Sequence, residues 1–306
     1  MTEPYHRGEI AVQELAGERA QAVLNGRVIS NAIPAPARAF VRQQAAVAIG
    51  WLDASGDPWA SFVVGEPGFV SCDEDGAVVT MHTSGPAAAF ARFEDTVRPG
   101  DALGMLVIDL ATRRRLRVNG VVERSAAGEL RVLVEQAYAN CPKYIQRRER
   151  VEAAPGQPAS AVVRSAGAPP DLSGWLARTD TAFVASIGPD GRIDCSHRGG
   201  RGGYMRLEGD AVLVPDYPGN SMFCTLGNMF VESRAGLVLV DFEARQQLHL
   251  SGDAWVEVAG PDRIGRTAGT GRWWRLRPVG WAVSPLPDTT GWRLVDESPF
   301  NPPLEP

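Results

Sequence analysis

The sequence predicts a mainly β protein with flanking helices, in which one domain fold occurs twice in tandem. Three observations lead to this prediction. The 306 residues include 33 glycines and 23 prolines, a composition that favours many turns over long helices. A segment of the first half recurs in the second half at a nearly constant offset. Both halves also contain short apolar runs joined by turn residues, which is the pattern of antiparallel strands.

Composition bounds the class of protein and its partners. A chain of this length favours two domains, because domains commonly have about 100–150 residues. The net charge of −5 argues against a general nucleic-acid binder, which needs a basic face to displace counterions. No stretch approaches the ~20 apolar residues of a membrane span, and the N-terminus lacks the apolar core of a signal peptide. The sequence therefore predicts a cytoplasmic protein with neither a nucleic-acid nor a membrane partner.

The repeat is clearest where residues 106–120 reappear as residues 238–252. Asp109 then matches Asp241, and every matched pair in the segment keeps this one offset. Further upstream, matched turns keep nearly the same offset, as Gly56 does with Gly191. Duplication followed by small loop changes leaves such a pattern, so we expect two domains of similar fold.

The first elements of each half follow the same plan of strand, tight turn and strand. Residues 45–52 and 59–64 form this unit in the first half, and residues 181–187 and 192–196 form it in the second. A succession of antiparallel strands with few helices is typical of an all-β barrel or sandwich.

The N-terminal region and the connection between the halves differ from this plan. Residues 9–24 carry apolar positions between charges, which predicts an amphipathic helix, and a shorter helix is expected through Phe40 and Val41. We expect both helices to pack outside the first barrel. A stretch rich in Ala, Pro, Gly and Ser predicts a linker. The expected domains are N-terminal helices at 1–44, a first β domain at 45–151, the linker at 152–170 and a second β domain at 171–306.

The two copies diverge most at residues 194–200, where polar residues and glycines replace the apolar strand 60–65 of the first copy. Hydroxyl and imidazole groups can hydrogen-bond a ligand, an arginine can form a bidentate contact with phosphate, and glycines let the backbone approach a flat ligand. A hairpin rich in turn residues explains the same residues equally well. The residues that this segment offers to a ligand are Ser196, His197, Arg198, Gly199 and Gly200.

A second candidate element is the loop from Pro215 that leads into a short helix ending near Asn228. Asn220 or Ser221 can act as the N-cap, so the free amides of the helix start could face an anion. A simple capped helix is the commoner explanation of such a pattern.

A third element is the segment 140–148 at the end of the first copy. Pro142 favours a helix start there, and Lys143, Arg147 and Arg148 concentrate positive charge that could reach across to the second copy. The alternative is a solvated basic face. Cys141 could have a lowered pKa near a helix start, but no base is placed beside it, so we assign no catalytic residue.

The sequence offers little support for other site chemistries. The four histidines His6, His82, His197 and His249 are scattered without ligand spacing, so we predict no metal site. The four cysteines show neither zinc spacing nor the density of a disulfide scaffold. Nucleotide-binding glycine motifs and a nucleophile elbow are also absent from the sequence.

Taken together, several segments in order resemble the pyridoxamine 5′-phosphate oxidase-like superfamily of FMN-binding split barrels, in particular its bacterial two-barrel members. The resemblance implies two tandem split β-barrels that form a pseudo-dimer in one chain, with the main FMN site in the second barrel. It covers nearly the whole chain. The segments that carry it are 8–14, Pro58-Trp-Ala-Ser61, 111–120, Asn140-Cys-Pro-Lys-Tyr-Ile-Gln146, Ser196-His-Arg-Gly-Gly200, Gly219-Asn220, Thr225-Leu-Gly-Asn228 and Ser298-Pro-Phe-Asn301.

The resemblance also assigns residues to the cofactor. It places Ser196, His197 and Arg198 along the flavin and its phosphate, and a loop of the second copy on the phosphate side. The sequence departs from the family pattern at Met222 and Cys224, and it lacks the Arg-x-Val-Leu-Leu-Lys strand that pyridoxamine phosphate oxidases use. Oxidation of vitamin B6 therefore does not carry over. The full set expected to bind FMN is Ser196, His197, Arg198, Gly199, Gly200, Asn220, Ser221, Thr225, Leu226, Asn228, Lys143, Tyr144 and Gln146.

Two functions follow from the resemblance. The first is an FMN-dependent oxidoreductase that passes hydride from a reduced donor such as NADH or NADPH to a small organic acceptor, with the cofactor doing the chemistry. The second is a protein that binds or senses FMN or haem, for which His197 and His249 are the candidate haem ligands in the second copy. We expect one FMN per chain, because Glu66 stands at the equivalent place in the first copy and would repel a phosphate. Relatives commonly form homodimers, and the sequence does not decide whether this chain does.

Overall fold

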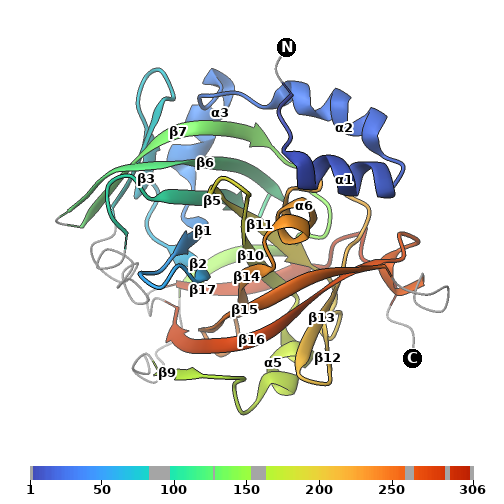
Figure 1. The fold of residues 1–306 in the computed structure, drawn as a ribbon. Helices are drawn as coiled ribbons and strands as arrows, with labels where there is room; N and C mark the ends of the chain where they lie inside the picture. The colour runs from blue at the N-terminus through green and yellow to red at the C-terminus, as the bar shows by residue number, and fades with distance from the viewer. Residues whose placement is uncertain are drawn as a thin grey trace.

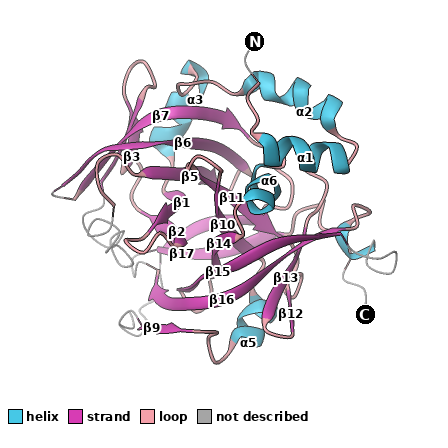
Figure 2. Cartoon of the chain, viewed as in Figure 1, coloured by secondary structure: helices cyan, strands magenta, loops and turns pink. Residues whose placement is uncertain are grey.

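The computed structural model of the chain describes residues 3–82, 97–126, 128–152, 163–258, 265–286 and 290–303. The described residues form a mainly β structure with flanking helices, which confirms the predicted class (Figure 1; Figure 2). No helix among them is long and apolar enough to cross a membrane.

A seven-stranded antiparallel sheet contains the strands of the first half, in the order β2-β1-β5-β6-β7-β4-β3. Successive side chains of a strand point to opposite faces of its sheet, so Val47 and Ile49 of β1 lie on one face, in a core that also includes Met105 of β5. Its strands are β1 (Ala46–Leu52), β2 (Pro58–Val64), β3 (Val70–Cys72), β4 (Val78–His82), β5 (Ala102–Asp109), β6 (Arg114–Ala126) and β7 (Glu129–Ala139).

The second half forms a sheet with the same strand order, β11-β10-β14-β15-β16-β13-β12, so each strand of the first sheet corresponds to the strand numbered nine higher. The strand pairing preserves the offset between the repeats. Leu106 of β5 pairs with Arg117 of β6, and the matching residues Val238 of β14 and His249 of β15 pair in the same way. The strands are β10 (Thr181–Ile187), β11 (Ile193–Gly199), β12 (Arg206–Glu208), β13 (Ala211–Pro215), β14 (Arg234–Asp241), β15 (Gln246–Val258) and β16 (Arg272–Pro285).

The two sheets share an apolar interface. Its core contains Phe62 of β2 and Phe183 of β10, whose rings stack with centroids 5.2 Å apart, together with small and aliphatic side chains from both halves. The backbones also approach closely, because a Cβ at Gly104 of β5 would lie 2.7 Å from the backbone of Asp194 in β11. Burial of this surface from water holds the two halves together.

Two smaller strand pairings complete the described sheets. β8 (Arg147–Glu152) pairs with β17 (Thr290–Asp296) in a two-stranded sheet. β9 (Val163–Ala166) adds to the edge of the second sheet beside β16. β9 lies within the stretch predicted to be a linker, and its exposed side chains leave no apolar pattern in the sequence. Residues 153–162 of that stretch lie outside the described residues, and the domain boundaries remain a prediction.

The predicted single helix at 9–24 is wrong. α1 (Arg7–Leu15) ends before Gly17, which has a φ of +70° that favours glycine, and α2 (Arg19–Asn25) starts after it. The periodicity of the residues did not reveal this break. The remaining helical elements of the described residues are η1 (Gly26–Val28), α3 (Ala35–Gln43), α5 (Leu172–Arg178), α6 (Cys224–Val231) and η4 (Gly265–Thr267).

The expectation that the first helix packs outside the first barrel is also wrong. α1 lies against α6 of the second half (Figure 1). Glycines on both helices let the backbones touch, because a Cβ on Gly8 would lie 2.2 Å from the carbonyl oxygen of Gly227. Amphipathic periodicity identifies a buried face but not the element that covers it.

Candidate functional site

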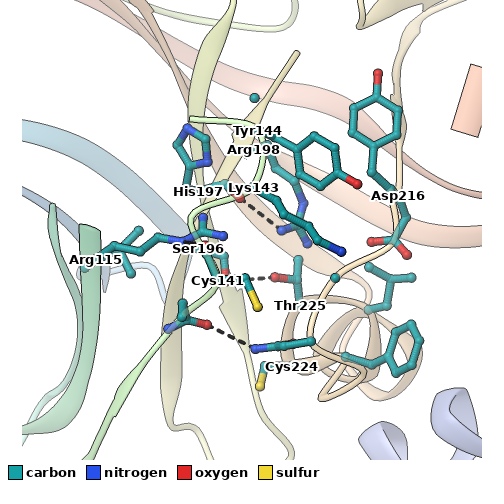
Figure 3. Close-up of a pocket in the computed structure, with 18 of the residues that line it drawn as sticks. Arg115, Cys141, Lys143, Tyr144, Ser196, His197, Arg198, Asp216, Cys224 and Thr225 are labelled. Carbon is teal, nitrogen blue, oxygen red and sulfur yellow. Dashed lines mark hydrogen bonds between the residues drawn. The ribbon is translucent and has the colours of Figure 1, made fainter. Parts of the chain in front are cut away.

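A cavity of about 110 Å³ opens where β6 of the first half meets β11 and α6 of the second. It is larger than the ~10–15 Å³ that one water molecule requires. Figure 3 shows its side chains converging from segments far apart in the sequence. The lining comes from β6, the turn at 140–144, β11 and the residues between Tyr204 and Leu226.

The cavity brings together most of the residues that the sequence had assigned to FMN. Gly200 and Gln146 lie beside it: the Gln146 side-chain amide donates to the Gly200 carbonyl at 2.9 Å, and its oxygen accepts from the Ser298 backbone at 2.9 Å. Asn228 lies instead in a second cavity. The expected residues that line the first cavity are Lys143, Tyr144, Ser196, His197, Arg198, Gly199, Asn220, Ser221, Thr225 and Leu226.

The helix expected to start at Pro142 is absent. The residues from Asn140 to Gln146 form a turn, in which Tyr144 has a φ of +67°, and β8 follows directly. The turn carries Lys143 and Tyr144 to the cavity, and the Tyr144 hydroxyl donates to the Pro218 carbonyl at 3.0 Å. Proline at a helix start is a local preference, and here the contacts of the turn with the second half override it.

The sequence predicted Asn220 or Ser221 as the N-cap of α6, and this prediction is wrong. The N-cap is Phe223, which has a left-handed φ of +59° and makes no side-chain capping bond. The Ser221 hydroxyl donates to Glu18 of the N-terminal region at 2.6 Å, so it serves a tertiary contact. The Asn220 side chain accepts from the backbone of Met222 at 3.2 Å.

Positive charge is concentrated around the cavity. Arg115, Arg117, Arg198 and Lys143 all line it, and Figure 3 shows Arg198 and Lys143 reaching into the same part of it. Burial, and then the neighbouring Arg198 and Arg117, lowers the pKa of Arg115 to about 9. The pKa of Arg198 is likewise lowered, mainly by burial. An anion in this cavity would offset the repulsion between these groups.

Two of these guanidinium groups have no carboxylate partner among the described residues. Arg115 donates through Nε to the Cys141 carbonyl at 2.8 Å. Arg198 donates to the His197 carbonyl at 3.1 Å, while its buried Nε has no partner within the described part of the chain. The Asp216 carboxylate at the cavity is already paired with Arg272 at 2.9 Å. The donors are therefore available to an acidic ligand.

Arg117 is the buried centre of a polar network that joins the two halves. It donates to the Tyr138 hydroxyl at 2.9 Å and to the Ser196 hydroxyl, and it lies 3.3 Å from the Asp194 carboxylate. Ser196 accepts in turn from Thr225 of α6 at 3.1 Å. These bonds hold β6, β11 and α6 in fixed relation around the cavity.

The sequence interpretation missed Arg115 and Arg117, although the repeat contained a signal for them. In the register that aligns Asp109 with Asp241, Arg115 matches Gln247 and Arg117 matches His249. Two strong cations in one copy thus stand where the other copy has neutral side chains. Other lining residues that were not assigned are Leu106, Asn140, Cys141, Tyr204, Pro215, Asp216, Tyr217, Gly219, Phe223 and Cys224.

The second cavity has a buried carboxyl group, Glu9, in its lining. The carboxylate accepts from the His6 backbone at 2.9 Å in the capping box of α1. Burial, and then the nearby Asp194, raises the pKa of Glu9 from an ordinary value of 4.5 to about 7. The folded protein therefore binds this proton more tightly than the unfolded chain does.

Glu9 gives the protein a pH-dependent loss of stability. Between pH 4.5 and 7 the folded state holds more protons than the unfolded state, so this group's contribution to stability falls as pH rises through that range. Glu9→Gln keeps the capping bond and removes the titration. We expect its melting temperature to exceed that of the wild type more at pH 8 than at pH 5. Equal differences at the two pH values would contradict this assignment.

Comparisons with known proteins find no matching protein-family model and no curated protein of significant similarity. Among the solved structures that match, an F420 reductase is 16% identical, with 37% of this chain and 98% of that chain covered and a TM-score of 0.28. A FAD-binding protein from Mesorhizobium loti is 12% identical, with 40% of this chain and 97% of that chain covered and a TM-score of 0.28. The haem storage protein HutZ from Vibrio cholerae is 14% identical, with 41% of this chain and 92% of that chain covered and a TM-score of 0.25. At these TM-scores the likeness carries no argument about this chain.

Proposed function

We propose that this protein is an FMN-dependent oxidoreductase and that the first cavity binds the phosphate end of the cofactor. The observation that supports this most directly is the set of three guanidinium groups and one lysine around one cavity, two of the guanidinium groups having no carboxylate partner among the described residues. Planar guanidinium groups match the geometry of phosphate oxygens. A phosphate dianion would therefore relieve repulsion and satisfy unpaired donors together.

The lining residues have distinct roles in this proposal. Arg198 supplies a charged fork to the phosphate, and Lys143 adds a point charge from the first half. Gly199 lets β11 pass close to the turn that contains Tyr144, because a Cβ at Gly199 would lie 2.0 Å from the Tyr144 carbonyl oxygen. The rings of Tyr144 and Tyr217, 4.9 Å apart between centroids, provide aromatic surface near the phosphate region.

The bound flavin would supply the redox chemistry, accepting hydride from a reduced nicotinamide or similar donor and passing electrons to a small organic acceptor. The protein's part is then to bind, orient and shield the cofactor. Arg117 and its network hold the strand that carries Ser196 and Arg198. No side chain needs to act as an acid or base, so none is proposed as catalytic.

We also propose that the two halves are tandem split barrels that form a pseudo-dimer with one cofactor site. The identical strand order of the two sheets supports the duplication. The place equivalent to the cavity lacks its cations: His249 replaces Arg117, and its ring nitrogens lie 2.8 Å from the Ala60 carbonyl and 2.8 Å from the Ser284 hydroxyl. The equivalent of Arg115 is Gln247, which bonds the backbone of Phe62.

One FMN per chain is the expected stoichiometry. Titration of the 306-residue chain with FMN, followed by flavin absorbance after removal of free ligand, should give a ratio of FMN to protein near one. A second FMN at the equivalent place, beside His249 and Gln247, would require burying a phosphate among neutral side chains, which is unfavourable. A ratio near two would contradict the proposal of a single site.

The alternative of a haem-binding or sensing protein receives less support. His249 is fully buried and both of its ring nitrogens already have partners. Burial lowers its pKa to about 3, as expected for a neutral structural histidine. His197 does line the first cavity, with a buried Nε2 that has no partner among the described residues.

A visible spectrum of the purified protein tests the proposal first. The absorption bands of an oxidised flavin support it, whereas a Soret band that depends on His197 supports the haem alternative. Steady-state oxidation of NADH or NADPH by the FMN-loaded protein, with a screen of small acceptors, then separates an enzyme from a carrier. A protein that binds flavin but is not reduced by any donor would contradict the oxidoreductase assignment.

A further inference from the structure

The second cavity, of about 230 Å³, lies between the N-terminal segment, strands β6 and β7, the turn that leads into β11 with the start of that strand, and α6. It is larger than the ~150 Å³ cavity that accommodates benzene in another protein. Cys224 lines both cavities, so the two are neighbours separated by the network of Arg117. The second cavity does not share the positive lining of the first.

Hydrogen-bond acceptors dominate the buried part of this cavity. The carboxyl groups of Glu9 and Asp194 line it, and these residues are only 7% and 8% exposed. Asp194 is already paired with Arg117 at 3.3 Å and accepts from Asn228 at 3.1 Å. The His6 Nε2 lies 3.5 Å from the Glu9 carboxylate and donates to Asn228 at 2.8 Å. Glu9 is therefore the carboxyl group of the cavity that has no lysine or arginine partner among the described residues. Arg192 at the rim is bonded to Glu135 and to Asp190, each at 2.9 Å.

Asn119 provides an independent sign of a ligand. This residue is 7% exposed, lines the cavity, and its side-chain oxygen has no donor among the described residues. The orientation of the amide is determined by its neighbours: the nitrogen donates to the Asp194 carboxylate, which can only accept, and to the Gln136 oxygen. An unpaired buried acceptor is unfavourable, and a donor on a bound ligand would satisfy it.

We propose that the second cavity binds a small organic ammonium ion. The ammonium group donates to the Asn119 side-chain oxygen and lies close to the Glu9 carboxylate. Its carbon body packs against the apolar part of the lining, to which Pro4, Tyr5 and Ile29 belong. This site is separate from the FMN site and does not depend on it.

The raised pKa of Glu9 is consistent with this site. Burial and the nearby Asp194 oppose its ionisation. A cation beside Glu9 would favour its ionised form, since opposite charges at short range stabilise each other.

Benzylamine, benzyl alcohol and benzoate test the proposal, because they share one ring and differ in charge. Each is titrated calorimetrically into the 306-residue chain at pH 8. We expect benzylamine to bind one per chain, about tenfold or more tighter than benzyl alcohol, and benzoate to bind more weakly than either. Glu9→Gln and Asn119→Leu should each weaken benzylamine binding by about tenfold or more. Glu14→Gln, an exposed carboxylate on the same helix, is the control and should leave it unchanged.

Equal binding of benzylamine and benzyl alcohol, or unchanged benzylamine binding in Glu9→Gln, would overturn the proposal. Glu9→Gln keeps the capping bond of α1, so it remains decisive even if Asn119→Leu does not fold. The FMN affinity of Glu9→Gln is measured in parallel and should equal that of the wild type. Loss of amine binding with intact FMN binding, or the reverse, distinguishes the two sites.

Discussion

Replacing Arg198 with alanine is expected to weaken FMN binding by about 10- to 150-fold. A charge-assisted hydrogen bond contributes roughly 1.5–3 kcal/mol, and each 1.4 kcal/mol changes affinity tenfold. Arg198 lines the first cavity and has no carboxylate partner among the described residues, so its charge is available to the ligand. Riboflavin lacks the phosphate and should lose much less affinity. Fluorescence titration of both ligands into the variant measures the two losses.

Two comparisons make this result specific. Lys143→Ala tests the competing phosphate contact from the first half, because its ammonium group could act as a point charge. Arg201→Ala removes a nearby arginine that pairs with Glu297 at 2.7 Å outside the cavity, and it should leave FMN binding unchanged. If Arg198→Ala binds FMN as tightly as the wild type does, the assignment of Arg198 to the phosphate is wrong.

Replacing Arg117 with methionine should lower the free energy of unfolding by about 3–5 kcal/mol, the usual loss when one partner of a buried ion pair is removed. Arg117 is 4% exposed and Asp194 is 8% exposed, with 3.3 Å between their charged groups. Methionine retains much of the side-chain volume but leaves the Asp194 carboxylate without its cation. Urea denaturation followed by circular dichroism measures the change.

The double variant Arg117→Met with Asp194→Asn should recover a large part of this loss, because it removes both charges together. Arg124→Met serves as the matched control on the same strand, since Arg124 is exposed and its pair with Glu129 is 3.9 Å long. Exposed pairs contribute about 0–1 kcal/mol. A loss no greater for Arg117→Met than for Arg124→Met would show that the buried pair does not carry this stability.

Several features of the fold followed from local patterns. The apolar runs around residues 45–52 and 181–187 became β1 and β10, because short apolar runs and the turn residues that bound them are properties of neighbouring positions. The offset between Asp109 and Asp241 anticipated two sheets with one strand order. The divergent segment that contains Ser196 and Arg198 was found by comparing the copies, and it lines the first cavity.

Local patterns misplaced elements whose ends depend on distant contacts. Ser221 has the chemistry of an N-cap, but its hydroxyl bonds Glu18 and the helix begins after Phe223. Pro142 favours a helix start, but the segment forms a turn against the second half. In both cases a tertiary hydrogen bond replaced the local one, and sequence spacing carries no record of such partners.

The residue pattern alone was sufficient to predict the strands, the duplication and the residues of β11 that line the first cavity. The packing of the two sheets determined the rest, because it brings Arg115 and Arg117 of the first half against β11 of the second. The same packing places Asn119 beside Asp194 and leaves its oxygen unpaired in the second cavity. Charge repulsion and unpaired donors or acceptors exist only between groups that are close in space. Both cavities therefore acquire their chemistry from contacts between halves that lie about one domain apart in the chain.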